Sequence, residues 1–288
     1  MRILITGADG QLGYELQRVL NRHDLVPALW PTFDLLNPEC EADVRAAKPD
    51  LVIHTAAYTD VDGAEREPDQ AMAINALGTE RVARGAAAVG ARLILLSTDY
   101  VFDGTKEMQY LETDEPRPLS VYGLSKLEAE RRAMAVCPNT LVVRTAWLYG
   151  PQGKNFVKTI MRLATEQSEL RVVADQRGSP THAGDLAEAL ARVVTLDLTG
   201  IVHATGSGDC TWYELARTIV GLLGKATSVR PITTAEAGRP APRPAYSVLA
   251  NRRLAEQGIA LPHWADALER FIKQVKVEVE AEVEKGSG

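Results

Sequence analysis

Short apolar runs alternate with longer helical patterns through the first half of the chain, and this alternation is the feature that most constrains the fold. Each run is hydrophobic at almost every position, which is typical of strands buried on both faces of a parallel sheet. Strand–helix–strand repetition then predicts right-handed crossovers and a doubly wound α/β sheet. The clear runs are Arg2–Gly7, Leu51–Ala57, Arg92–Asp99 and Thr140–Gly150, and a weaker run, Leu25–Trp30, contains a proline.

Helical patterns fill the intervals between these runs. They cover about Gln11–Arg22, Gly63–Val89 and Tyr122–Ala135. The second half is less regular, with helices predicted at 155–166, 185–196 and 211–224, short strands at 171–175 and 200–205, and a Pro-rich loop at 237–247. The helix at 211–224 has a Thr and a Glu at capping-box spacing and a Gly at its end.

A chain of 288 residues is long enough for two moderate domains. We predict a nucleotide-binding domain over residues 1–150, which later segments rejoin, and a smaller α/β domain mainly over residues 151–274 that covers one edge of the sheet. Residues 275–288 read as a tail. Valine alternates with glutamate there, and we expect a frayed or extended end. The terminal Gly-Ser-Gly is typical of an added linker.

Composition excludes several classes of function. A formal net charge of −6 argues against a general nucleic-acid binder, and no apolar run approaches the ~20 residues of a membrane helix. The first residues, MRILITGADG, lack the pattern of a signal peptide. The three cysteines are widely spaced and the five histidines are scattered, so neither a disulfide framework nor a metal site is predicted. A reducing cytoplasm is the simplest location.

Three glycines, Gly7, Gly10 and Gly13, stand between the first strand and the first helix. Glycines allow a tight turn and let the backbone approach a pyrophosphate, while the helix N-terminus supplies free N–H groups. The spacing is GxxGxxG, and its position between a strand and a helix favours a dinucleotide site over a plain turn. No acidic residue ends the second run, where Leu29, Trp30 and Pro31 stand, so the pattern is ambiguous between NAD and NADP.

A tyrosine and a lysine four residues apart, Tyr122 and Lys126, lie on one face of a predicted helix. The pair could place a phenol and an ammonium in one pocket. Equally, both side chains could cover the core with their polar ends in water. The stretch by itself leaves both readings open.

Longer motifs favour the first interpretation, a phenol and an ammonium in one pocket, because they resemble those of a known family. The glycine loop, STDYVF at the end of a later strand and Tyr122-x-x-x-Lys126 resemble an extended short-chain dehydrogenase/reductase. The segments VIHTAAYTDVDGAERE, STDYVFDG, VYGLSKLEAE, VRTAWLYG and DQRGSPTHAGDLA are more specifically similar to the dTDP-4-dehydrorhamnose reductase family. The resemblance extends from Met1 to about Lys273.

The resemblance implies a Rossmann fold and an oxidoreductase of dTDP-L-rhamnose biosynthesis. Such an enzyme passes a hydride from NADPH, the preferred cofactor, or from NADH to the 4-keto group of dTDP-4-dehydro-β-L-rhamnose. The expected partner is this nucleotide sugar, with no nucleic acid and no membrane, and the resemblance also allows a homodimer. An unperturbed tyrosine titrates near ~10, and we expect the ammonium of Lys126 and an oxidised nicotinamide to lower the pKa of Tyr122.

The resemblance also assigns residues to roles. Tyr122 would be the general acid, Lys126 its tuner and a cofactor anchor, and Thr98 an orienting hydroxyl. The remaining cofactor positions would be Gly7, Gly10, Gln11, Leu12, Gly13, Asp34, Leu35, Ala56, Ala57, Tyr58, Thr59 and Leu96. The substrate positions would be Thr98, Asp99, Trp147, Asn155 and Arg243, the last because a guanidinium suits phosphate oxygens.

Two other functions are compatible with parts of the sequence, and one family feature is missing from it. A nucleotide-sugar dehydratase needs an Asp-Glu pair directly after the threonine, whereas Asp99 and Tyr100 follow Thr98, so dehydration is disfavoured and another reductase or an epimerase is not. Non-catalytic NADP-binding regulatory subunits of methionine adenosyltransferase also resemble this family.

Some members of the family form metal-linked dimers through glutamates. Glu15 matches one such position and Gly184 the second, so no metal site is predicted.

Overall fold

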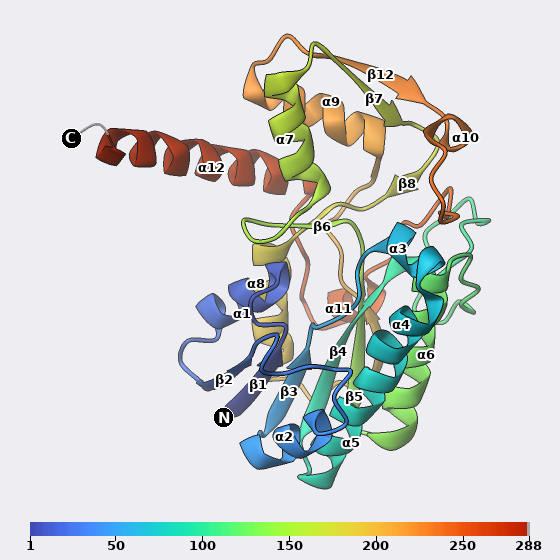
Figure 1. Cartoon of the computed structure of the whole chain (residues 1–288), viewed down its shortest axis with the longest axis vertical. Helices are drawn as coiled ribbons and strands as arrows, with labels where there is room; N and C mark the ends of the chain where they lie inside the picture. Colours follow the sequence, from blue (N-terminus) through green and yellow to red (C-terminus); the bar gives the residue numbers. More distant parts are fainter. Residues whose placement is uncertain (287–288) are drawn as a thin grey trace.

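A six-stranded parallel sheet forms the centre of the larger part of the molecule (Figure 1). The computed structural model describes residues 1–286, and the side chains of residues 1–276. The strands stand in the order β10-β5-β4-β3-β1-β2, which confirms the predicted doubly wound sheet. Their bounds are β1 Arg2–Thr6, β2 Asp24–Ala28, β3 Leu51–His54, β4 Arg92–Thr98, β5 Thr140–Thr145 and β10 Gly200–His203. The proline of the weak run lies in β2, an edge strand, where a missing N–H is tolerated.

Helices cover both faces of this sheet (Figure 1). Alternate residues of one strand point to opposite faces, so Ile3 and Ile5 pack with helices α1 and α8, whereas Leu4 packs with α2, α5 and α6. The helices span α1 Gln11–Val19, α8 Ala183–Val193, α2 Cys40–Ala47, α5 Thr79–Ala88 and α6 Val121–Val136. Burial on both faces explains why the strands are almost wholly apolar.

A smaller part lies beyond the carboxyl ends of the strands (Figure 1). Its core is formed by α7 Phe156–Glu166, α9 Trp212–Leu223, α12 Trp264–Gly286 and the parallel pair of β7 Glu169–Val173 and β12 Ser228–Ile232. The predicted capping box of α9 is confirmed, because Thr211 and Glu214 bond each other's backbone N–H groups. Gly224 ends this helix at a φ of 66°.

Short elements connect the two parts. They are β6 Leu148–Tyr149 with β9 Thr181–His182, and β8 Arg177–Gly178 with β11 Cys210–Thr211. Helices α3 Val61–Arg66 and α4 Pro68–Met72, the π-helical turn Ala73–Gly78, the 3-10 turn Asp99–Val101, α10 Thr234–Ala237 and α11 Arg252–Glu256 complete the fold. Because α8 and β10 pack on the large sheet, the chain returns to it after residue 150.

Two expectations from the sequence are wrong. The run Thr140–Gly150 is not one strand, because the chain turns at Trp147, whose φ is +48°, and continues in another sheet as β6. The tail is not extended, since α12 continues through the Val/Glu repeat to Gly286. Glutamate, lysine and alanine favour helix, and here they outweigh the β-branched valines. The last two residues of the predicted tail lie outside the described residues.

None of the described helices combines the length and the apolar character that crossing a bilayer requires.

Candidate active site

A cavity of about 830 Å³ lies at the carboxyl ends of the strands, where open α/β sheets hold their ligands. Its wall includes residues of the large sheet and residues that lead into the smaller part. The structure thereby brings together most of the site residues predicted from the sequence. Those that line the cavity are Gly7, Gly10, Gln11, Leu12, Asp34, Leu35, Ala56, Ala57, Thr59, Leu96, Thr98, Asp99, Tyr122, Lys126 and Trp147.

The glycine loop leaves one end of this cavity lined by backbone. Gly7 has a φ of +64°, and a Cβ there would lie 2.8 Å from the nitrogen of Ala56. Gly10 precedes α1, and neither a side-chain cap nor an acidic residue occupies the first turn of the helix. Amide groups of the helix N-terminus therefore remain available to an anion.

Gly13 serves packing rather than the cavity wall. A Cβ at this position would overlap the carbonyl oxygen of Gly7 and lie 2.7 Å from the Cα of Ala8. We expect Gly13→Ala to lower the free energy of unfolding by about 1–3 kcal/mol, because strand and helix must separate. Chemical denaturation measures the loss. Gly221→Ala in α9 is the matched control, since nothing lies within 4 Å of its Cβ and alanine favours helix. Equal stability of the two variants would contradict this account.

The three predicted catalytic residues converge from one strand and one helix. Thr98 ends β4, while Tyr122 and Lys126 stand one turn apart at the start of α6. Ser120 caps that helix by accepting a hydrogen bond from the N–H of Gly123 at 3.1 Å. The ammonium of Lys126 donates to the carbonyl oxygen of Leu96 at 2.7 Å, and the lysine is 5% exposed. A phenol, a hydroxyl and an ammonium thus share one wall.

The protein's own groups keep the phenol protonated. Burial raises the pKa of Tyr122 to about 12, although the adjacent Thr98 hydroxyl has the opposite, smaller effect. Burial also lowers the pKa of Lys126 to about 8, and the carboxylate of Glu130 counteracts part of that effect. Lys126 is not among the groups that shift the pKa of Tyr122 in the protein alone, and the joint effect expected of the ammonium and an oxidised nicotinamide stays a prediction. A neutral phenol is the form that can donate a proton.

Asp99 sits behind Thr98 and is 2% exposed. Ser247 donates to its Oδ2 at 2.5 Å and Thr98 donates to its Oδ1 at 3.1 Å. Burial outweighs both hydrogen bonds and raises the pKa of this carboxyl to about 7. Asp99 therefore holds the Thr98 hydroxyl in place, and its charge changes near neutral pH.

A π-helical turn is linked to Tyr122 by hydrogen bonds. Asn75 lies in the π-helical turn, and such turns are frequent at functional sites. Its Oδ1 accepts from the N–H of Tyr58 at 2.8 Å, and its Nδ2 donates to Ser125 at 2.9 Å. Ser125 in turn donates to the carbonyl oxygen of Tyr122 at 2.8 Å. The loop after β3 and the start of α6 are thus tied together.

Trp147 forms part of the opposite wall in a strained conformation. Its φ of +48° is uncommon for a bulky residue and marks a position that its surroundings hold in place. The indole stacks on Trp212, with ring centroids 3.4 Å apart and planes at 7°. A Cβ on Gly178 would lie 2.6 Å from the indole, so only glycine leaves room there. The indole is thus held between Trp212 and Gly178 where Trp147 borders the cavity.

Four predicted site residues do not line the cavity. Gly13 packs as described above. The Tyr58 hydroxyl donates to Glu67 at 3.0 Å and its N–H donates to Asn75 at 2.8 Å. The Asn155 amide donates to Gln11 at 3.0 Å and its oxygen caps α7. Arg243 forms an ion pair with Asp62 at 3.0 Å. Binding roles for these four stay predictions.

Other residues of the cavity wall were not among the predicted site residues. They are Asp9, Trp30, Phe33, Leu36, Thr55, Gln70, Ile74, Ser97, Thr145, Ala146, Leu148 and Gly153. Lys154, which the KNF motif of the family resemblance assigns to the substrate domain, also lines the cavity. Thr55, Ser97 and Thr145 stand at or just after strand ends, and that position is a signal that the sequence already offers. Gln70 and Ile74 give no such signal, because they come from helical turns that only the tertiary fold brings to the cavity.

Within residues 1–286 no group of three or more His, Cys, Asp and Glu residues is arranged to hold a metal ion. Glu15 is buried and pairs with Arg18 at 2.8 Å. Gly184 lies beside it without a carboxylate.

Comparison with known proteins agrees with this geometry. The RmlD substrate binding domain model matches residues 1–277. The spore coat polysaccharide biosynthesis protein SpsK of Bacillus subtilis is 41% identical, over 95% of this chain and 97% of that protein. The dTDP-4-dehydrorhamnose reductase of Mycobacterium tuberculosis H37Rv is 43% identical, over 93% of this chain and 91% of that protein.

A solved structure shows the same fold. The dTDP-4-dehydrorhamnose reductase of Bacillus anthracis, in complex with NADP, matches with a TM-score of 0.92 and 40% identity, over 95% of this chain and 99% of that one. The chain belongs to the RmlD substrate binding domain family, and its relatives include dTDP-4-dehydrorhamnose reductases.

Proposed function

We propose that the chain is an NADPH-dependent dTDP-4-dehydrorhamnose reductase, which converts dTDP-4-dehydro-β-L-rhamnose to dTDP-β-L-rhamnose. The observation that carries the proposal is one cavity that holds both the glycine loop and the wall formed by Thr98, Tyr122 and Lys126. Relatives at about 40% identity over nearly the whole chain bear the reductase name.

The residues present fit a nicotinamide dinucleotide. Free amide groups at the start of α1 suit its pyrophosphate, and Asp34 and Leu35 line the end of the cavity beside β2. Lys126 lies where the nicotinamide ribose is expected in this family. The bound cofactor supplies the hydride that reduces the ketone carbon.

The protein's own residues handle the proton. The neutral phenol of Tyr122 donates its proton to the carbonyl oxygen as that oxygen gains negative charge. The Thr98 hydroxyl donates to Asp99 in the protein alone, and it turns to donate to the same carbonyl oxygen when the keto-sugar is bound. The ammonium of Lys126 stabilises the phenolate that remains. Trp147 borders the same cavity and is expected to contact the sugar nucleotide.

Turnover tests the proposal directly. The purified protein is mixed with dTDP-4-dehydro-β-L-rhamnose and either NADPH or NADH, and the loss of reduced-nicotinamide absorbance is followed. We expect turnover with both cofactors and the higher rate with NADPH. Folded protein that binds NADP⁺ but reduces no keto-sugar would sink the proposal and favour the regulatory-subunit alternative.

The pH dependence of kcat/KM should report the state of Lys126. Its pKa is lowered to about 8, so the ammonium loses its proton as the pH rises through that value, and kcat/KM should fall on the alkaline side. The pKa of Asp99 is raised to about 7, so the profile is also recorded for Asp99→Asn. The wild-type profile should contain one change near pH 7 from Asp99 and one near pH 8 from Lys126. Asp99→Asn should lose the change near pH 7 and keep the fall near pH 8. A flat profile to pH 10 would contradict the role of Lys126.

We further infer a cytoplasmic location, since the three cysteines are free and buried, as is typical of a reducing compartment. We also expect neither nucleic acid nor a membrane among the partners, because the net charge is −6. A homodimer remains part of the proposal.

A further inference from the structure

The segment between β6 and α7 lies against the glycine loop, although more than 130 residues separate them in sequence. The side chain of Asn155 donates to the Gln11 side chain at 3.0 Å and to the carbonyl oxygen of Gly150 at 2.9 Å. Gln11 is the first residue of α1, the helix whose N-terminal amides are uncapped. The segment 150–155 thus sits beside the phosphate-binding end of the cavity.

A lysine outside the cavity holds this segment in shape. The ammonium of Lys158 donates to the carbonyl oxygens of Pro151 and Gly153, at 2.8 and 3.0 Å. Asn155 also caps α7 by accepting from the N–H of Lys158 at 2.9 Å. These hydrogen bonds fix the segment on both sides of Lys154, and they thereby fix the backbone position of Lys154.

Lys154 lines the cavity and its ammonium has no protein partner within residues 1–276, whose side chains the structure describes. The charged residues of the described cavity wall are Asp9, Asp34, Asp99, Lys126 and Lys154. Lys126 is buried and donates to Leu96, so Lys154 is the cation of this wall that remains exposed. Any dinucleotide or nucleotide-sugar ligand brings a negatively charged diphosphate into a wall with three acidic residues.

We infer that Lys154 is a diphosphate-binding residue that contacts the pyrophosphate of the nicotinamide cofactor at the glycine-loop end of the cavity. The inference rests on the proposed function for the identity of the ligand. The cofactor pyrophosphate is favoured over the diphosphate of the sugar nucleotide because Asn155 ties the segment to Gln11 of the glycine loop. A Cβ on Gly153 would also lie 3.4 Å from Gln11, which shows how closely the two loops approach.

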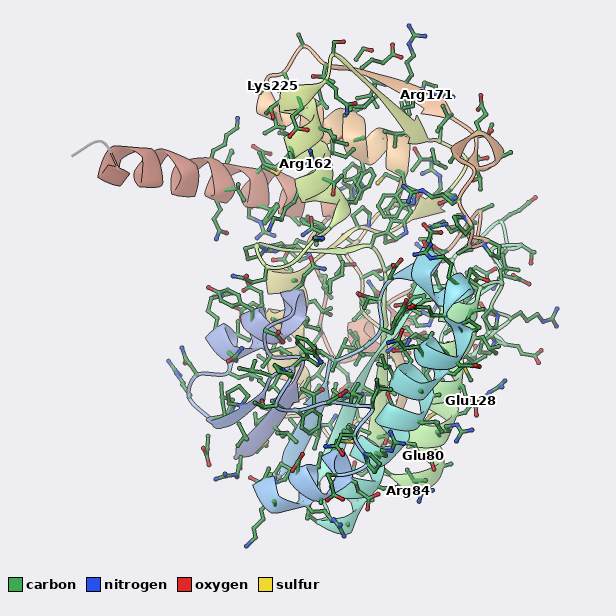
Figure 2. The ribbon with its side chains drawn as sticks, viewed as in Figure 1. Glu80, Arg84, Glu128, Arg162, Arg171 and Lys225 are labelled. Atoms are coloured by element: carbon green, nitrogen blue, oxygen red, sulfur yellow. The ribbon has the colours of Figure 1, made fainter. Side chains whose placement is uncertain are left out.

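Binding measurements test this role without turnover. Dissociation constants for NADP⁺, NAD⁺ and dTDP are measured by calorimetry for the wild type, Lys154→Gln, Lys154→Arg and Lys225→Gln. Lys225 is the matched control, an exposed lysine at the far end of the smaller part (Figure 2). Lys225→Gln removes the same charge as Lys154→Gln, but Lys225 is not part of the cavity wall.

We expect Lys154→Gln to raise the dissociation constants for NADP⁺ and NAD⁺ by about tenfold each, as for the loss of one charge-assisted hydrogen bond. Lys154→Arg should stay within about threefold of the wild type, because a guanidinium also binds phosphate. Lys225→Gln should change neither. Binding of NADP⁺ to Lys154→Gln should also depend less on salt, since one screened attraction is gone.

Three other results would overturn the assignment. Weaker binding of NADP⁺ alone would place the ammonium at the 2′-phosphate, because NAD⁺ has the pyrophosphate but lacks that group. Weaker binding of dTDP alone would place it at the substrate diphosphate. Unchanged binding of all three ligands would make Lys154 a solvated loop lysine. Failure of the proposed function shows up separately, as protein that binds NADP⁺ through Lys154 but reduces no keto-sugar.

Discussion

Tyr122→Phe is expected to lower kcat by about 10²–10⁴-fold, the usual contribution of a positioned general acid. The variant removes one hydroxyl and leaves the ring, which meets Tyr100 edge to face at 5.9 Å between centroids. Lys126 keeps its hydrogen bond to Leu96, and the glycine loop is untouched. The dissociation constant for NADP⁺ should therefore change by less than about threefold, since cofactor contacts remain.

Turnover and calorimetric binding of NADP⁺ together check this expectation. Tyr14→Phe is the control, because it removes the same hydroxyl from a tyrosine of α1 that is 45% exposed. The control should retain wild-type kcat. If Tyr122→Phe kept more than a tenth of the wild-type kcat, another group would have to donate the proton, and the mechanism proposed here would be wrong.

The sequence was most informative where local pattern and position coincide. The strands of the large sheet are buried on both faces, so their apolar runs stand out, and Thr98 is recognisable because it ends such a run. Tyr122 and Lys126 share a face because a helix repeats every 3.6 residues. Resemblance to a family then turned a common spacing into a specific expectation.

Features that depend on distant segments could not be read in the same way. The turn at Trp147 is held by Trp212 and Gly178, which lie far from it in sequence. The place of β10 beside β5 depends on pairing across more than 50 residues. Asn75 supports the site only because a π-helical turn faces α6. Hydrophobic period and turn chemistry contain none of this information.

The pKa of Tyr122 shows the same limit in energetic terms. A lysine four residues away suggests a lowered pKa, because a nearby positive charge favours the negatively charged phenolate. Burial acts in the opposite direction, and it depends on which residues of the whole fold surround the phenol. In the folded chain burial has the larger effect and raises the pKa to about 12.

A buried ion pair joins the elements that bear the site. Arg144 of β5 donates from Nε and Nη2 to Glu130 of α6, at 2.9 and 2.6 Å, and both side chains are 1% exposed. Ser97, next to Thr98, donates to the same carboxylate. Glu130 also follows Lys126 by one helical turn, so strands β4 and β5 and helix α6 meet at one carboxylate.

Arg144→Met is expected to lower the free energy of unfolding by about 3–5 kcal/mol. The substitution keeps much of the side-chain length but leaves the carboxylate of Glu130 buried without its cation. Desolvation of an unpaired charge is the reason for so large an effect, since a methionine of similar length leaves little empty space. Urea denaturation of the wild type and the variant measures the difference from the shift of the midpoint.

The double variant Arg144→Met/Glu130→Leu separates the lost ion pair from a general loss of packing. With both charges removed, no unpaired carboxylate remains, so the double variant should be more stable than Arg144→Met by roughly 2 kcal/mol. The hydroxyl of Ser97 then lacks its acceptor and Lys126 loses a nearby carboxylate, but no carboxylate is left buried without a partner. If the two substitutions instead added their destabilising effects, packing rather than charge would hold β4, β5 and α6 together. The position of Thr98 and Lys126 would then depend on the shape of the core and not on this pair.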